Sequence, residues 1–206
     1  MRRKLKNKTV PTKMYKKMEK QIFNEISESI KIIEKTTSLI PEISIAVKMI
    51  VNAIKTGNKI IIFGNGGSAA DAQHIAAELI GRFQKERKSY PALALTTDSS
   101  VITSLGNDYS FDVIFSRQCE SLVVKNDVVV GISTSGNSIN VIKGLETAKE
   151  NGATTISLVG NKGGKMKDVS DVTIIIDSES TAKIQEAQRI IYHIICKFVE
   201  EKISET

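Results

Sequence analysis

Apolar residues recur at spacings of three and four through the first part of the chain. Residues 14–35 form one such stretch, and the spacing predicts an amphipathic helix. Its apolar face consists of Met14, Met18, Ile22, Ile26, Ile30 and Ile33. A second helical pattern opens at Pro41 and stops at Thr56-Gly57, since proline is favoured in a first helical turn and glycine commonly ends a helix. Two helices are therefore expected ahead of the first strand.

From Lys59 onward the pattern changes to short β-branched runs that alternate with helical stretches. Five runs have the length and composition of buried strands: residues 60–63, 92–95, 128–132, 155–159 and 172–176. Helical patterns cover residues 69–80, 111–122, 139–151 and 182–200. This alternation is typical of parallel strands joined by crossover helices. We therefore predict an α/β fold with a doubly wound, five-stranded, mainly parallel sheet and helices on both faces.

The chain of 206 residues is long enough for one domain with a full hydrophobic core. Its net charge of +6 is concentrated at one end, where residues 1–20 hold nine Lys or Arg and a single acid. Residues 1–13 are predicted to be a basic, disordered leader, and residues 14–206 to form a single domain. Because the rest of the chain is slightly acidic, a nucleic-acid partner is not expected.

The sequence shows neither the apolar region of a secretory signal nor a continuous apolar stretch of membrane-spanning length. Neither export nor a membrane partner is expected, and the protein is predicted to be cytoplasmic. Cys119 and Cys196 lie far apart and in no CxxC motif. This pattern indicates reduced, unpaired thiols and gives no support to cysteine catalysis.

Ligands of a doubly wound sheet bind beyond the carboxyl ends of its strands, so the loops there are examined for chemistry. The first is Gly64-Asn65-Gly66-Gly67-Ser68, the glycine loop. Its glycines let backbone amides approach a ligand closely, and the helix that follows offers its N-terminus to an anion. The alternative is a tight turn that serves only the geometry between strand and helix, and the loop by itself favours neither.

The second is Ser133-Thr134-Ser135-Gly136-Asn137-Ser138, the serine loop. Four hydroxyls around one glycine at a helix start can bind several phosphate oxygens at once. The alternative is an N-cap provided by Ser138 or Asn137, but a cap needs one hydroxyl and the loop has four, which favours phosphate binding. No lysine follows the glycine as in a P-loop, and this disfavours a nucleotide triphosphatase.

The chain has only two histidines. His74 stands four residues before Glu78 on one helix face, as metal coordination or coupled proton transfer requires, although a solvated pair has the same spacing. His193 follows Gln185 in an apolar helix, where a buried, satisfied histidine is the simpler interpretation. Eight helical residues separate these two by ~12 Å. To share one ion, their side chains must lean together, or ligands must come from different subunits.

Taken in order, these segments resemble the phosphoheptose isomerases of the sugar isomerase (SIS) superfamily. The matching segments are residues 64–74, Ala77-Glu78-Leu79, Gly81-Arg82-Phe83, Gly106-Asn107-Asp108, Phe115-Ser116-Arg117-Gln118, residues 131–138, Ile184-Gln185-Glu186 and His193. They extend over about residues 15–200. The series is specific, whereas each loop taken singly is not.

The resemblance implies a zinc cofactor held by His74, Glu78, Gln185 and His193. It also implies substrate contacts from Asn65, Gly66, Gly67, Asn107, Asp108, Ser133, Thr134, Ser135, Ser138 and Gln185. Such enzymes interconvert sedoheptulose 7-phosphate and D-glycero-D-manno-heptose 7-phosphate for bacterial surface glycans, and they form homotetramers with shared active sites. Ala182 stands where some of these isomerases have an acid, so no catalytic role is expected there.

The activity expected from this resemblance is aldose–ketose isomerisation through an enediol, which needs a base, an acid and stabilisation of the oxyanion. As a hypothesis, Glu78 is the base and His193 the acid and base on the sugar oxygens, while zinc polarises the carbonyl and the serine loop anchors the phosphate. If Glu78 binds the metal tightly, His193 or Asp108 has to replace it as the base.

Two rival functions remain open. One is isomerisation of a five-carbon or six-carbon sugar phosphate by the same fold. The other is a non-catalytic sugar-phosphate sensor or DnaA-type interaction module. Relatives of the latter type lack the residues that correspond to Glu78 and His193, and this chain has both.

Overall fold

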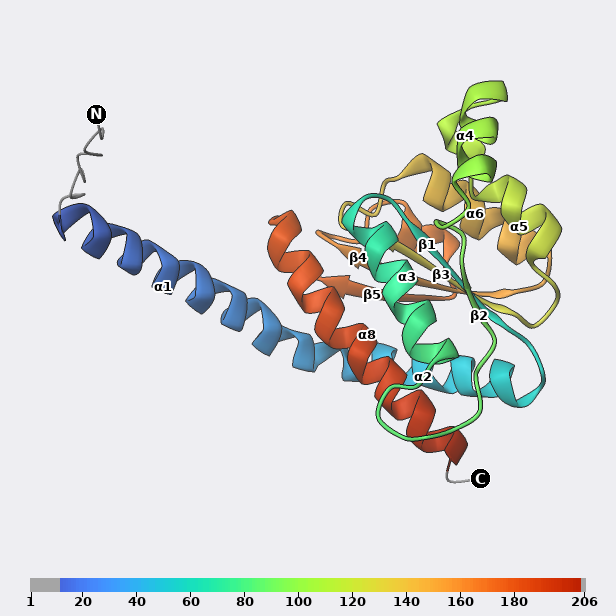
Figure 1. Ribbon diagram of the computed structural model, residues 1–206, viewed down its shortest axis with the longest axis horizontal. Helices are drawn as coiled ribbons and strands as arrows, with labels where there is room; N and C mark the ends of the chain where they lie inside the picture. Colours follow the sequence, from blue (N-terminus) through green and yellow to red (C-terminus); the bar gives the residue numbers. More distant parts are fainter. Residues whose placement is uncertain (1–11, 205–206) are drawn as a thin grey trace, which may run out of the picture.

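The computed structural model describes residues 12–204, with side chains from Met14 onward. Two helices, α1 (Thr12–Lys35) and α2 (Ile40–Lys55), open the chain and are joined by the 3-10 turn η1 (Thr36–Leu39). Both predicted N-terminal helices are confirmed, and α1 projects from the body as a long arm (Figure 1). Apart from the backbone at the start of α1, the predicted basic leader lies outside the described residues.

The five predicted strands form one parallel sheet. They are β1 (Ile60–Gly64), β2 (Ala92–Ala94), β3 (Val128–Ser133), β4 (Thr154–Gly160) and β5 (Val172–Ile176). Their order is β2-β1-β3-β4-β5, and all four neighbouring pairs are parallel. The predicted fold class is thereby confirmed. The strand order reverses between β1 and β3, which is where ligands bind in such sheets.

The helices cover the two faces of the sheet (Figure 1). The remaining helices are α3 (Gly67–Ile80), α4 (Ser99–Asp108), α5 (Ser116–Leu122), α6 (Ile139–Glu150), α7 (Met166–Val169) and α8 (Thr181–Ser204). One hydrophobic core joins the sheet to α2, α3 and α8, and a second joins it to α5, α6 and α7. In β1, Ile60 and Ile62 enter the first core while Ile61 and Phe63 enter the second. Burial on both faces explains why the strands are apolar without alternation.

Two helices and one break differ from the prediction. Helices α4 and α7 were not predicted, and the expected helix over 111–122 is divided into a 3-10 turn, η2 (Phe111–Val113), and α5. Helix α4 is only ten residues long and no residue of it is fully buried, although Ile102 and Leu105 pack partly against the second core. Between η2 and α5, Ile114 and Phe115 are both buried. Two successive buried side chains do not fit the one-sided face of a surface helix.

Residues Met14–Lys55 contain a helical stretch that could span a membrane by length and composition alone. Within that stretch, however, α2 buries Ile43, Val47 and Ile50 in the first core. This part of the stretch thus belongs to the core, while 28% of the membrane-length window as a whole is buried.

The two cysteines are free and buried, as the sequence suggested. Burial raises the pKa of both the Cys119 and the Cys196 thiol to about 12. Because the thiolate is the reactive form, neither side chain is suited to nucleophilic catalysis.

Candidate active site

The glycine loop and the serine loop leave β1 and β3 at the same edge of the sheet. These strands are paired in register up to Gly64 and Ile132, so the two loops begin side by side. Gly66 has a φ of 55°, which L side chains rarely adopt. At Gly67 an added Cβ would lie 2.3 Å from the Gln185 Nε2 atom. The glycines are therefore needed for the turn and also to admit a side chain from α8.

The hydroxyls of the serine loop face one another. Ser133 Oγ lies 3.0 Å from Ser138 Oγ and 3.4 Å from Ser135 Oγ. Ser138 occupies the N-cap position of α6, yet its side chain makes no capping hydrogen bond. The N-cap interpretation is therefore not supported for Ser138. Thr134 is half-buried and Ser135 is exposed.

The loop after β4 supports the serine loop from outside. Gly136 has a φ of 66°, and an added Cβ would meet the Gly163 carbonyl oxygen at 2.1 Å. The Met166 amide donates to the Gly136 carbonyl at 3.0 Å, and the Lys165 amide donates to Asn137 Oδ1, also at 3.0 Å. Asn137, the other candidate cap, is thus engaged with the neighbouring loop.

Helices α3 and α8 run side by side in the same direction. Their contacts occur in the same order along both helices. Gly67 contacts Gln185, Asp71 contacts Arg189, and His74 contacts His193. Spacings of three and four residues keep these positions on one face of each helix. The seam between the two helices therefore starts at the glycine loop and leads to the histidines.

His74, Glu78 and His193 converge within this single chain. One ligand atom from each lies within 4.8 Å of the others, and all three residues are half-buried. His74 Nε2 lies 2.9 Å from Glu78 Oε1 and 3.5 Å from His193 Nε2. Burial, reinforced by the neighbouring His74, holds the pKa of His193 below its usual value. A neutral imidazole with a lone pair on Nε2 is the form that binds metals or accepts a proton.

The donor set of this group fits a zinc ion. Two atoms that bind one tetrahedral zinc at ~2.05 Å lie about 3.3 Å apart, close to the two distances from His74 Nε2. Two imidazole nitrogens and a carboxylate oxygen that face one another bring three lone pairs together, an arrangement that a cation stabilises. The residues present therefore suit the metal that the family resemblance implies.

Gln185, the fourth predicted zinc ligand, lies two turns earlier in α8. Its amide packs over Gly67, at the glycine-loop end of the seam. Gln185 and His193 are therefore as far apart along α8 as the sequence indicated. The amide lies nearer to the predicted substrate contacts than to the two imidazoles.

Asn107 and Asp108 lie at the end of α4, which stands over the β2 edge and apart from α8 (Figure 1). Both are exposed, and Asn107 Nδ2 donates to Asp108 Oδ1 at 2.8 Å. The structure does not bring these two predicted substrate contacts to the histidines of the same chain. Asn65 is placed differently, since its side chain pairs with that of Asn140 in α6.

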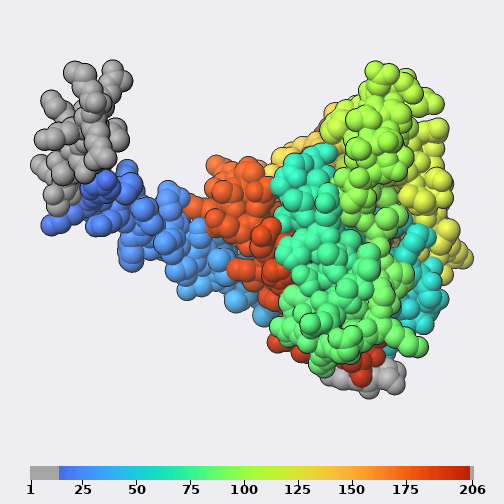
Figure 2. Space-filling view, viewed as in Figure 1, coloured from blue at the N-terminus to red at the C-terminus, as the bar shows by residue number. Residues whose placement is uncertain are grey.

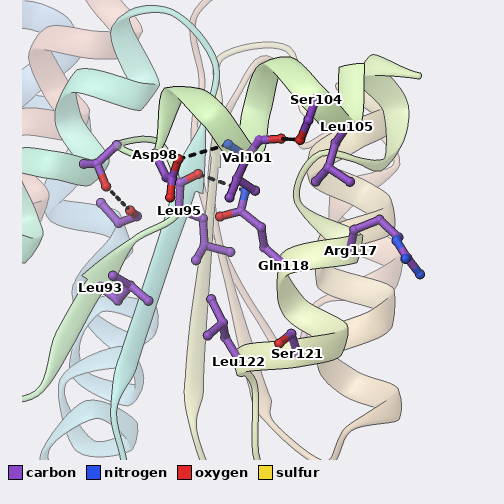
Figure 3. A pocket seen from close by; sticks show the side chains of 12 residues that line it. Leu93, Leu95, Asp98, Val101, Ser104, Leu105, Arg117, Gln118, Ser121 and Leu122 are labelled. Carbon is purple, nitrogen blue, oxygen red and sulfur yellow. Dashed lines mark hydrogen bonds between the residues drawn. The ribbon is translucent and has the colours of Figure 1, made fainter. Parts of the chain in front are cut away.

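A cavity of about 610 Å³ lies between β2, α4 and α5 (Figure 3). Asp98, on its wall, accepts from the Val101 amide at 2.9 Å and caps α4. Gln118, also on the wall, donates to the carbonyl oxygens of Leu95 and Ile114. The cavity contains none of the predicted site residues, and these polar groups already serve the fold, so we assign it no catalytic role.

Sequence reasoning missed the residues that support the candidate ligands. The buried Glu200 accepts from the amides of Phe83, Gln84 and Lys85 and from Arg87 Nε. Arg87 in turn donates to the backbone carbonyl of Glu78 at 2.8 Å. Burial by itself would raise the pKa of Glu200, but these hydrogen bonds and Arg87 outweigh it and hold the pKa below its usual value. A single acid in the last helix gives no sequence signal of this role.

Asp71 and Tyr192 were missed as well. Both are buried, and the Tyr192 hydroxyl lies within hydrogen-bonding distance of both Asp71 and His74. Burial, followed by the nearby Asp71 carboxylate, raises the pKa of Tyr192. An Asp three residues before His74, on the same helix face, was the available signal.

Comparison with known proteins identifies the family of the chain. The SIS domain family model matches residues 21–160. A phosphoheptose isomerase of Aquifex aeolicus is 55% identical over 157 residues, which cover 76% of this chain and 82% of the relative. One from Citrifermentans bemidjiense is 54% identical over 165 residues, covering 80% and 86%. The solved phosphoheptose isomerase of Neisseria gonorrhoeae matches with a TM-score of 0.85 and 38% identity, covering 89% of this chain and 99% of that one. The chain therefore belongs to the phosphoheptose isomerase family of SIS-domain proteins.

Proposed function

We propose that this chain is an aldose–ketose isomerase that converts sedoheptulose 7-phosphate to D-glycero-D-manno-heptose 7-phosphate. The single observation that carries the proposal is the convergence of His74, Glu78 and His193 on a seam that begins at the glycine loop. Acid–base groups and an anion site are thus connected along one surface. The names of the similar proteins supply the substrate.

The serine loop is proposed to anchor the phosphate. Its hydroxyls face one another, and the Ser138 hydroxyl is not engaged in capping α6. Hydroxyls and helix N-terminal amides can then donate to several phosphate oxygens together. Binding energy from this remote group helps to hold the reacting carbons in place.

Glu78 and His193 are proposed to move the protons. Glu78 removes a proton from the carbon next to the carbonyl, and His193 transfers protons at the sugar oxygens. The lowered pKa of His193 supports its role, because a neutral imidazole whose lone pair is not bound to zinc can accept a proton and then return it. His74, Glu78 and His193 would hold the zinc ion, which when bound would polarise the sugar carbonyl. Gln185 would complete the ligand set only if its side chain leaned toward His193 or came from another subunit.

We further propose a homotetramer with active sites shared between subunits. The face of α1 is apolar at Met14, Met18, Ile22, Phe23, Ile26 and Ile30, each between 46% and 69% exposed. Figure 2 shows α1 projecting from the body. Large apolar side chains in one stripe mark a packing surface, and their four-residue spacing suits another helix. A second copy would also supply Asn107 and Asp108, which lie away from the histidines of their own chain.

The proposed enzyme acts in the cytoplasm, and its product feeds a surface glycan such as lipopolysaccharide or capsule. The proposal is tested against two alternatives. One is an isomerase of a five-carbon or six-carbon sugar phosphate, and the other is a non-catalytic sensor or DnaA-type module.

The test combines metal analysis with an isomerase assay on the purified full-length chain. We expect close to one zinc per chain, turnover of sedoheptulose 7-phosphate, loss of turnover with a chelator, and recovery on adding zinc. Phosphates of five-carbon and six-carbon ketoses serve as controls, and faster turnover of either would reassign the substrate. Binding of sugar phosphates without turnover, in zinc-loaded protein, would favour the sensor instead.

A further inference from the structure

Tyr192 places its hydroxyl between two polar partners in a closed part of the core. Its side chain is 1% exposed, and Asp71 is 2% exposed. The hydroxyl oxygen lies 3.1 Å from His74 Nδ1 and 3.2 Å from Asp71 Oδ1. Since little water reaches these groups, their hydrogen bonds have to be satisfied by one another.

The direction of the two hydrogen bonds follows from the available protons. Arg189 Nη2 donates to the same Asp71 oxygen at 2.9 Å, so this oxygen is the acceptor toward both of its neighbours. A phenol carries one proton, and Tyr192 donates it to Asp71. The Tyr192 oxygen is then an acceptor toward His74, so His74 Nδ1 must be the donor.

A proton on Nδ1 leaves Nε2 of a neutral His74 with its lone pair exposed. That nitrogen faces Glu78 Oε1 at 2.9 Å and His193 Nε2 at 3.5 Å. The His74 ring also meets the Tyr192 and His193 rings edge-on, at 67° and 70°. Contacts on the Nδ1 side of the His74 ring thus fix both its protonation pattern and its orientation.

We propose that Tyr192 and Asp71 are positioning residues that hold His74 as the Nδ1–H tautomer and thereby prearrange the three ligand atoms for a divalent cation. The inference rests on the proposed function, because the cation is the zinc ion proposed there. Groups that orient a histidine ligand in this way typically contribute 10-fold to 100-fold, roughly, to metal affinity.

The first test is Tyr192→Phe, which removes the hydroxyl and keeps the ring. The zinc dissociation constant, measured by competition with a chelator on the full chain, is expected to rise by about 10-fold to 100-fold. With saturating zinc, kcat is expected to stay near that of the unchanged protein, since the Tyr192 side chain is only 1% exposed and its hydroxyl is occupied by Asp71 and His74. Asp71→Asn is expected to weaken zinc binding in the same direction.

The matched control is Tyr90→Phe. Tyr90 is also buried, and its ring lies 3.8 Å from the Arg87 guanidinium carbon. The ring, and with it this contact, is retained in the variant. Its zinc affinity is expected to equal that of the unchanged protein. Equal affinity in Tyr192→Phe as well would overturn the proposal.

A measurement on the unchanged protein covers the case in which Tyr192→Phe does not fold. In the zinc-free chain, nitrogen–proton NMR should already show the His74 ring proton on Nδ1, close in space to the Tyr192 ring. A His74 proton on Nε2 would contradict the proposal. Failure of the proposed function can be told apart from failure of this inference. If zinc affinity depends on Tyr192 but the zinc-loaded chain isomerises no sugar phosphate, the positioning role is supported and the proposed activity is not.

Discussion

Asn65 and Asn140 exchange two side-chain hydrogen bonds, each donating Nδ2 to the Oδ1 of the other at 2.8 and 2.9 Å. The first residue belongs to the glycine loop and the second to the buried start of α6, so the pair ties the glycine loop to the helix that follows the serine loop. Asn140 Oδ1 also accepts from the Val141 amide. The two candidate anion-binding loops are thereby held as one unit.

Removing this link is expected to weaken both the fold and the substrate site. Asn140→Ala leaves the Asn65 amide unpaired, which should lower the free energy of unfolding by about 1–3 kcal/mol. KM for the sugar phosphate should rise more than kcat falls. Asn151→Ala is the control, because Asn151 likewise donates a side-chain hydrogen bond, here to the backbone carbonyl of Cys119, away from the loops. If KM is equal in the two variants, the Asn65–Asn140 pair has no role in substrate binding.

Ser138 is expected to matter for phosphate and little for stability. A serine that caps a helix costs about 1 kcal/mol when replaced by alanine, but the Ser138 side chain makes no capping bond. Ser138→Ala should therefore unfold at nearly the same denaturant concentration while KM rises. Asp98→Ala, which removes the cap of α4, should show the loss of stability instead. A large stability loss in Ser138→Ala would restore the capping interpretation.

Glu78→Gln keeps the size of the side chain and removes its charge. If Glu78 is the base, kcat should fall by roughly 10²-fold to 10⁴-fold. Glu120→Gln, in an exposed ion pair with Arg117, should be indistinguishable from the unchanged protein. Zinc content is measured on the same samples, because loss of zinc would assign the effect to ligation. Near-normal turnover with zinc bound would remove Glu78 from the mechanism.

Glu200 should make the free energy of unfolding depend on pH in the acidic range. Its folded-state pKa lies below the usual 4.5, so its contribution is complete above that value and is lost as the pH falls toward the lower folded-state pKa. Glu200→Gln should lower the free energy of unfolding by about 3–5 kcal/mol at neutral pH, since it leaves Arg87 without its buried partner. Below about pH 4 the difference between the two proteins should shrink. Denaturant titrations at several pH values measure this, and a constant difference would contradict it.

A charge within the apolar stripe of α1 should break the proposed assembly. Ile26→Glu places a carboxylate in the contact, whereas Lys20→Glu adds acid at a polar, exposed position of the same helix. Light scattering should show tetramers for Lys20→Glu and smaller species for Ile26→Glu. Turnover should fall with the assembly if Asn107 and Asp108 act across subunits. Full activity in a dissociated variant would place the whole site within one chain.

The parallel sheet and its two site loops could be predicted because each depends on local composition. Five β-branched runs, such as 128–132, stand out from the helices between them. The pairing of His74 with Glu78 follows from helical spacing, and its convergence with His193 was anticipated from the family resemblance. These features are encoded near where they act.

Other features depend on which elements become neighbours, and spacing along the chain does not reveal this. Asp71 in an alanine-rich helix resembles a surface acid until Arg189 and Tyr192 of α8 are placed beside it. The role of Glu200 depends on a loop more than a hundred residues earlier in the chain. Helix α4 offers only a short apolar pattern, and Ile102 and Leu105 are just partly buried against the second core.

The parallel course of α3 and α8 has an electrical consequence. Each helix carries partial positive charge at its N-terminus and partial negative charge at its C-terminus, and here both point the same way. Their fields add along the shared seam instead of cancelling as they do in antiparallel helix pairs. An anionic group that binds at the glycine-loop end therefore meets the positive ends of both helices at once.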